Sequence, residues 1–156
     1  MLLDTYFYHL PRAIPAHECE EIIEYGKSLN PTEGRTAASD SMLSSEEKQE
    51  HTQKIRNSKT AFIKDTWLIK DLYSIVEYAN KSWNFNLKYN EDVQFTEYEA
   101  RGHYGWHNDS IKNPLNDKTV MRKLSTVVQL SPPENYVGGD LKFNMRGLDS
   151  HTEDTI

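Results

Sequence analysis

Two stretches of the chain repeat their apolar residues at helical spacing. The first begins at Pro15, where Cys19, Ile22 and Ile23 recur every three to four positions and glutamates fill the intervening faces. The second covers 67–83 and carries a continuous apolar stripe. The residues of that stripe are Leu68, Leu72, Ile75, Val76, Ala79 and Trp83. Because a one-sided stripe is typical of a helix that buries one face, both helices are expected to pack on a core.

After Asn90 the pattern changes to the alternation and β-branched content of strands. Residues 93–98 alternate, 124–130 are rich in β-branched residues, and a turn with two prolines and two glycines leads to a third strand over 140–145. Earlier in the chain, strands are expected over 1–10 and 61–63. Helices first and strands later predict an α+β protein, with helices packed on a β core.

The long polar segment 31–58 has little periodicity. It is predicted to be a mobile loop that contains one short helix over 44–53. Long loops in compact domains are often functional, so this loop is a candidate lid over a substrate, with an ordinary surface loop as the alternative.

Composition narrows the class of protein. The 156 residues suit one domain, 1–156, and 37% apolar with 27% charged residues are typical of a globular chain. The net charge of −6 disfavours general nucleic-acid binding, and no apolar run is long enough to cross a membrane. The single cysteine, Cys19, favours a reducing compartment and hence a cytoplasmic location.

The chemistry-bearing candidates are His107 and Asp109, two positions apart. In an extended strand such residues point to the same face, and they offer one nitrogen and one oxygen ligand to a metal. Two histidines and a carboxylate form the facial triad of non-haem iron(II) oxygenases. A zinc hydrolase that uses His103 as well remains an alternative, although Gly102 and Gly105 argue against the helix that this spacing needs.

The surrounding sequence resembles the prolyl 4-hydroxylase-like family of 2-oxoglutarate/iron(II) oxygenases, especially its small bacterial and viral members. The stretch QFTEYEARGHYGWHND, 94–109, is similar to the strand that ends in the family's His-x-Asp motif. The stretch RKLSTVVQLSPPENYVGGDLKF, 122–143, is similar to the next core strand and turn. Upstream, IPAHECEEIIEYG (14–26) and RNSKTAF (56–62) resemble the family's first helix and first sheet strand.

This resemblance implies a double-stranded β-helix (jelly-roll) core with N-terminal packing helices. It implies that His107 and Asp109 are the first two iron ligands, and that Tyr98, Gln129 and Leu141 contact the cosubstrate 2-oxoglutarate. The implied reaction is hydroxylation of a C–H bond, by analogy in a peptidyl proline, with ascorbate as reductant. A peptide or protein substrate is therefore expected, and a free amino acid, another side chain or a nucleobase stay open as alternatives.

The chain departs from the family at the third iron ligand. The single histidine after Asp109 is His151, in a polar stretch without a strand pattern. The expectation is a chain that stops before the distal histidine and the last core strands, and that is inactive or poorly active alone. A degenerate, non-catalytic binding module of the same fold is the second hypothesis that remains open.

Overall fold

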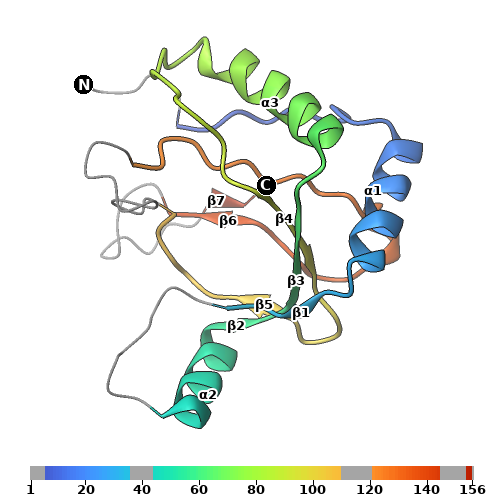
Figure 1. Ribbon diagram of the computed structural model, residues 1–156, viewed down its shortest axis with the longest axis vertical. Helices are drawn as coiled ribbons and strands as arrows, with labels where there is room; N and C mark the ends of the chain where they lie inside the picture. Colours follow the sequence, from blue (N-terminus) through green and yellow to red (C-terminus); the bar gives the residue numbers. More distant parts are fainter. Residues whose placement is uncertain (1–5, 36–43, 110–120, 145–153, 156) are drawn as a thin grey trace.

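The computed structural model describes residues 6–35, 44–109, 121–144 and 154–155. It is a mixture of helices and small antiparallel sheets, which confirms the α+β class (Figure 1). In chain order the elements are α1 (Ala16–Ser28), β1 (Thr32–Glu33), α2 (Ser45–Ile55), β2 (Arg56–Asn57), β3 (Lys59–Ile63), α3 (Thr66–Asn80), β4 (Val93–Glu97), β5 (His103–Tyr104), a 3-10 turn η1 (Pro133–Asn135), β6 (Lys142–Phe143) and β7 (Asp154–Thr155).

The largest described sheet has the strand order β1-β3-β4, and all its pairs are antiparallel. Its main pair joins β3 to β4, with Ala61 opposite Phe95 and Ile63 opposite Val93. Two shorter pairs, β2 with β5 and β6 with β7, complete the described strands. The β2–β5 pair fixes the backbone just before His107.

The core lies where α1 and α3 meet one face of the β3–β4 pair. Ile22 from α1, Leu68 from α3, Ile63 from β3 and Phe95 from β4 are buried together. Ile63 is 1% exposed, because strand alternation turns it toward the helices while its neighbour Phe62 faces outward. The two helical stripes predicted from the sequence therefore do cover a shared core.

The polar segment 31–58 is more ordered than the sequence suggests. It contains β1, β2 and the whole of α2, which starts with a capping box. The Ser44 hydroxyl accepts from the Glu47 N–H, and the Glu47 carboxylate accepts from the Ser44 N–H. The expectation of a loop is thus wrong where β1, α2 and β2 form, the short helix expected over 44–53 is confirmed, and the role of a lid stays a prediction.

Several predicted strands are absent or short in the described residues. No strand forms over 124–130 or over 6–10, and only Lys142–Phe143 pairs within 140–145. Valine-rich sequence favours a strand only when a partner edge is available, and tertiary context overrides such propensity. The described sheets do not make up a jelly roll. Residues 1–5 and 145 lie outside the described residues.

Gly26 marks the closest approach between α1 and the sheet. A Cβ atom at this position would overlap the ring of Phe95. The helix can therefore pack this close to β4 only because glycine has no side chain. Gly26→Ala is expected to lower the free energy of unfolding by about 1–3 kcal/mol, because overpacking outweighs the better helix propensity of alanine. Urea unfolding measures this, with Glu24→Ala on the same helix as the control. An unchanged or higher stability in Gly26→Ala would contradict the packing described.

Candidate metal site

His107 and Asp109 lie in an irregular segment directly after β5, rather than within a strand. The segment starts from a fixed point, because Tyr104 pairs with Arg56 of β2 and the Gly105 N–H donates to the Ile55 carbonyl. The side chains of His107 and Asp109 converge, with Nε2 and Oδ1 3.2 Å apart. The convergence expected from strand alternation is therefore present, although the local backbone that produces it is a bend.

The imidazole of His107 is oriented by two contacts. Its Nδ1–H donates to the Gly105 carbonyl over 2.8 Å, since a carbonyl can only accept. The ring of Tyr104 stacks on it, with centroids 3.8 Å apart and planes 11° apart. The proton on Nδ1 leaves the Nε2 lone pair directed at Asp109 in the neutral ring.

This arrangement fits two adjacent positions of an octahedral metal coordination sphere. Two ligand atoms that each lie about 2.1 Å from one ion at a right angle are about 3 Å apart, close to the observed separation of Nε2 and Oδ1. Metal-bound histidines almost always donate their other ring N–H to a carbonyl or carboxylate, as His107 does to Gly105. Two facing acceptor atoms need a cation between them, either a proton or a metal ion.

His103 does not join this pair. Its two ring nitrogens lie 3.2 Å from the Arg101 carbonyl and 3.3 Å from the Lys54 carbonyl. Across the described ranges, no group of three or more histidine, cysteine, aspartate or glutamate residues is arranged to hold a metal ion. The structure therefore does not bring His103 together with His107 and Asp109, and the zinc alternative stays a prediction. His151, the other histidine considered as a ligand, lies outside the described residues.

A hollow of about 310 Å³ opens beside Asp109. Its lining residues are Phe85, Asp109, Met121, Arg122, Lys123 and Ser125. Arg122 donates from Nε and Nη2 to the Glu91 carboxylate, and this bond raises the pKa of the guanidinium, with a smaller contribution from the charge of Asp109. Lys123 lies 5.6 Å from the ring centre of Phe85. Arg122 is thus paired with a carboxylate, whereas Lys123 contacts an aromatic face beside the candidate ligands.

Tyr98 follows β4 and is half-exposed. Burial of the phenol raises its pKa, and the nearby charge of Arg56 opposes this shift. Arg56 itself is 5% exposed; it donates to Ser58 and lies 4.5 Å from the ring centre of Tyr104, the residue that stacks on His107. Tyr98 therefore belongs to a polar-aromatic cluster that reaches the candidate ligand through Arg56 and Tyr104.

The other two predicted cosubstrate contacts lie elsewhere. Gln129 is exposed, and its amide donates to the Tyr136 hydroxyl over 3.1 Å. Leu141 is 38% exposed and directly precedes β6. Neither residue, nor Tyr98, lines the hollow beside Asp109.

Sequence reasoning did not select three features of this region. They are the buried Arg56, the stacking ring of Tyr104 and the cationic Arg122–Lys123 wall of the hollow. Arg56 lies within a stretch, 56–62, that already resembled the oxygenase family, but a lone arginine in a strand is usually exposed. Its burial becomes visible only once β2 pairs with β5.

Comparison of the chain with protein-family models, with curated proteins and with solved structures gives no match. No helix in the described part of the chain is both long and apolar enough to span a bilayer. The functional hypothesis therefore depends on the site geometry and on the motif resemblance.

Proposed function

We propose that this chain carries two iron(II) ligands, His107 and Asp109, of a 2-oxoglutarate-dependent dioxygenase that hydroxylates a C–H bond in a peptide or protein. The observation that carries the proposal is the 3.2 Å separation of Nε2 and Oδ1, with Nδ1 of His107 held by the Gly105 carbonyl. The resemblance of the surrounding stretches to prolyl 4-hydroxylase-like enzymes supplies the reaction class. A jelly-roll core is part of the same proposal.

Bound iron would supply dioxygen activation, which couples decarboxylation of 2-oxoglutarate to substrate hydroxylation, with ascorbate as reductant. The protein orients the ligand side chain and attracts the cosubstrate. The Gly105 carbonyl and the Tyr104 ring hold the imidazole, and Lys123, in the lining of the hollow, presents positive charge to a dicarboxylate. Tyr98, Gln129 and Leu141 remain the proposed cosubstrate contacts. The lone thiol of Cys19 is buried and free, in keeping with a reducing cytoplasm.

The stacking contact of Tyr104 yields a test of how His107 is oriented. Tyr104→Leu is expected to weaken iron(II) binding about tenfold, because the imidazole loses the flat surface that holds its plane. Tyr104→Phe keeps that surface and is expected to bind iron(II) as the wild type does. The measurement is anaerobic equilibrium binding of iron(II). Equal losses in both variants would show that the hydroxyl, not the ring, is responsible.

The reaction class is tested by anaerobic titration of the chain with iron(II) and then with 2-oxoglutarate. The expected result is a visible absorption band that requires both additions, because the cosubstrate chelates the bound metal. The band should survive in His103→Ala and disappear in His107→Ala. Iron binding without any response to 2-oxoglutarate would instead favour the non-catalytic binding module, and absence of iron binding would refute the proposal.

A further inference from the structure

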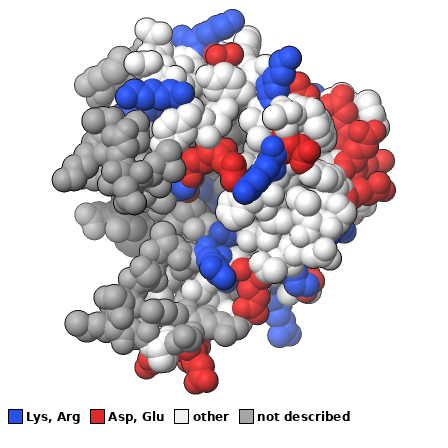
Figure 2. Space-filling view, in the orientation of Figure 1, with Lys and Arg blue, Asp and Glu red and all other residues white. Residues whose placement is uncertain are grey.

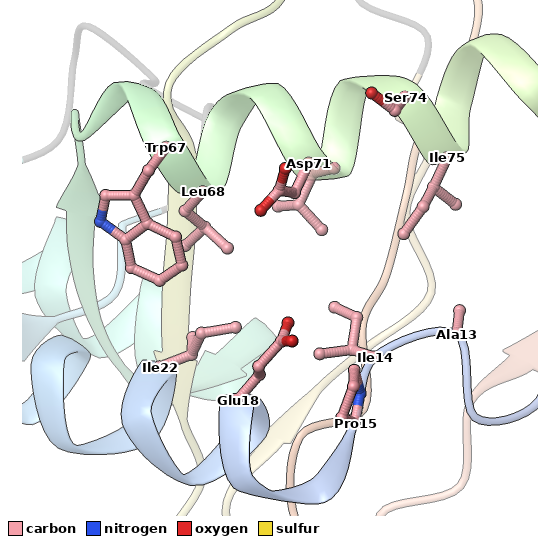
Figure 3. A pocket seen from close by; sticks show the side chains of 11 residues that line it. Ala13, Ile14, Pro15, Glu18, Ile22, Trp67, Leu68, Asp71, Ser74 and Ile75 are labelled. Atoms are coloured by element: carbon pink, nitrogen blue, oxygen red, sulfur yellow. The ribbon is translucent and has the colours of Figure 1, made fainter.

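A second hollow, of about 360 Å³, lies between α1 and α3, far along the chain from the candidate metal ligands (Figure 3). Its lining is mainly apolar. The lining residues are Ala13, Ile14, Pro15, Glu18, Ile22, Trp67, Leu68, Asp71, Leu72, Ser74 and Ile75. The indole of Trp67 is 47% exposed at one end of the hollow, so a ligand can reach its face.

Two carboxylates point into this otherwise apolar hollow from opposite sides. Glu18 projects from α1 and Asp71 projects from α3, and their ends face one another in Figure 3. Within the described ranges Asp71 makes no hydrogen bond or ion pair, and Glu18 has only a 4.0 Å contact with the exposed His17. Both carboxylates are accessible from solvent, so a cation that enters the hollow can donate a charge-assisted hydrogen bond to either of them.

The chemistry of the lining favours an organic cation over a metal ion. Calcium needs six to eight oxygen ligands and magnesium an octahedral set, whereas this hollow offers two carboxylates among aliphatic side chains. The hydroxyl of Ser74 already donates to the Lys70 carbonyl. An arginine side chain fits better, because its planar fork can bond two carboxylates while its face stacks on an indole.

The helix α1 beside the hollow is rich in negative charge, which would attract an arginine side chain. α1 carries Glu18, Glu20, Glu21 and Glu24, and acidic side chains gather over this helix in the space-filling view (Figure 2). The whole chain has a net charge of −6. Complementary charge of this kind steers a basic partner and fixes its register.

We propose that the hollow between α1 and α3 binds an arginine side chain of a partner peptide, flanked by apolar residues. The guanidinium lies between Glu18 and Asp71 and stacks on Trp67, and the flanking side chains contact Ile14, Leu72 and Ile75. The site is separate from the candidate metal ligands and does not depend on iron.

Binding of a capped peptide, acetyl-Gly-Leu-Arg-Leu-Gly-amide, to the metal-free chain tests this proposal by calorimetry or NMR titration. Glu18→Gln and Asp71→Asn are each expected to weaken binding about tenfold, since each removes one charge-assisted hydrogen bond. The double variant Glu18→Gln/Asp71→Asn should bind the arginine peptide more weakly than either single variant does. The same peptide with citrulline, a neutral analogue of arginine, should bind the wild-type chain at least as weakly as the arginine peptide binds this double variant.

The matched control is the double variant Glu77→Gln/Asp92→Asn, which changes the net charge by the same amount at exposed positions that do not line the hollow. It should retain wild-type affinity within about twofold, as expected of charges at the rim or outside a contact. Three results would overturn the proposal. They are an equal loss of affinity in the control and in Glu18→Gln/Asp71→Asn, equal affinity of the wild-type chain for the citrulline and arginine peptides, and no binding of the arginine peptide. Backbone NMR spectra of each variant confirm that its fold is retained.

Discussion

Replacing His107 with alanine is expected to lower the affinity of the chain for iron(II) by about 100-fold or more. Loss of a residue that only supports a metal ligand costs about 10- to 100-fold, and loss of a ligand itself should cost at least as much. The reason is that Nε2 is one of two protein atoms directed at the proposed ion, and the other, Oδ1 of Asp109, lies 3.2 Å away. Asp109→Ala is expected to have an effect of the same size. Anaerobic equilibrium dialysis or competition with a chromophoric chelator measures both.

His103→Ala is the matched control for these variants. His103 is exposed, lies in β5 just before the segment that carries the pair, and bonds only backbone carbonyls through its ring. It should bind iron(II) within about threefold of wild type, in line with a residue that makes no contact with the ion. Loss of affinity in His103→Ala equal to that in His107→Ala would mean that the metal binds elsewhere or that the segment reorganises.

Replacing Phe95 with alanine is expected to lower the free energy of unfolding by about 3–5 kcal/mol, the usual cost of removing a buried aromatic side chain. Phe95 is 6% exposed and is packed with Ile22, Ile63 and Leu68, so the lost ring opens a cavity between both helices and the sheet. Urea denaturation would show this as a lower midpoint with an unchanged slope.

Phe62→Ala provides the comparison for Phe95, because it removes the same ring from the paired strand. Phe62 is 57% exposed on the opposite face of β3, and its loss should change stability by about 0.5 kcal/mol or less. If the two variants are destabilised equally, the core does not lie on the face of the sheet described above.

The helices and the central strand pair could be predicted from the sequence because their patterns are local. Apolar residues at helical spacing identify α1 and α3, and alternation identifies β4, each without knowledge of the partner. The motif at His107 and Asp109 could be predicted as a pair for a similar reason. Residues two positions apart stay close in many extended conformations, and here the pair converges even in a bend.

The parts that sequence reasoning missed depend on contacts between distant segments. Residues 124–130 have strong strand propensity but pair with no strand among the described residues. The hollow between α1 and α3 needs two helices separated by more than thirty residues, so the approach of Glu18 to Asp71 has no local pattern. Strand propensity reflects the available packing partners more than a preference of the backbone, which is why residues 124–130 differ from their prediction.

The most direct test of the site follows the imidazole nitrogens of the six histidines by nitrogen-15 NMR as iron(II) is added without oxygen. Because Nδ1 of His107 is held by the Gly105 carbonyl and Nε2 faces Asp109, paramagnetic broadening should begin at His107 Nε2. The resonances of His103 should persist longer. Unchanged His107 resonances at saturating iron(II), or equal broadening of all six histidines, would contradict a metal site at His107 and Asp109.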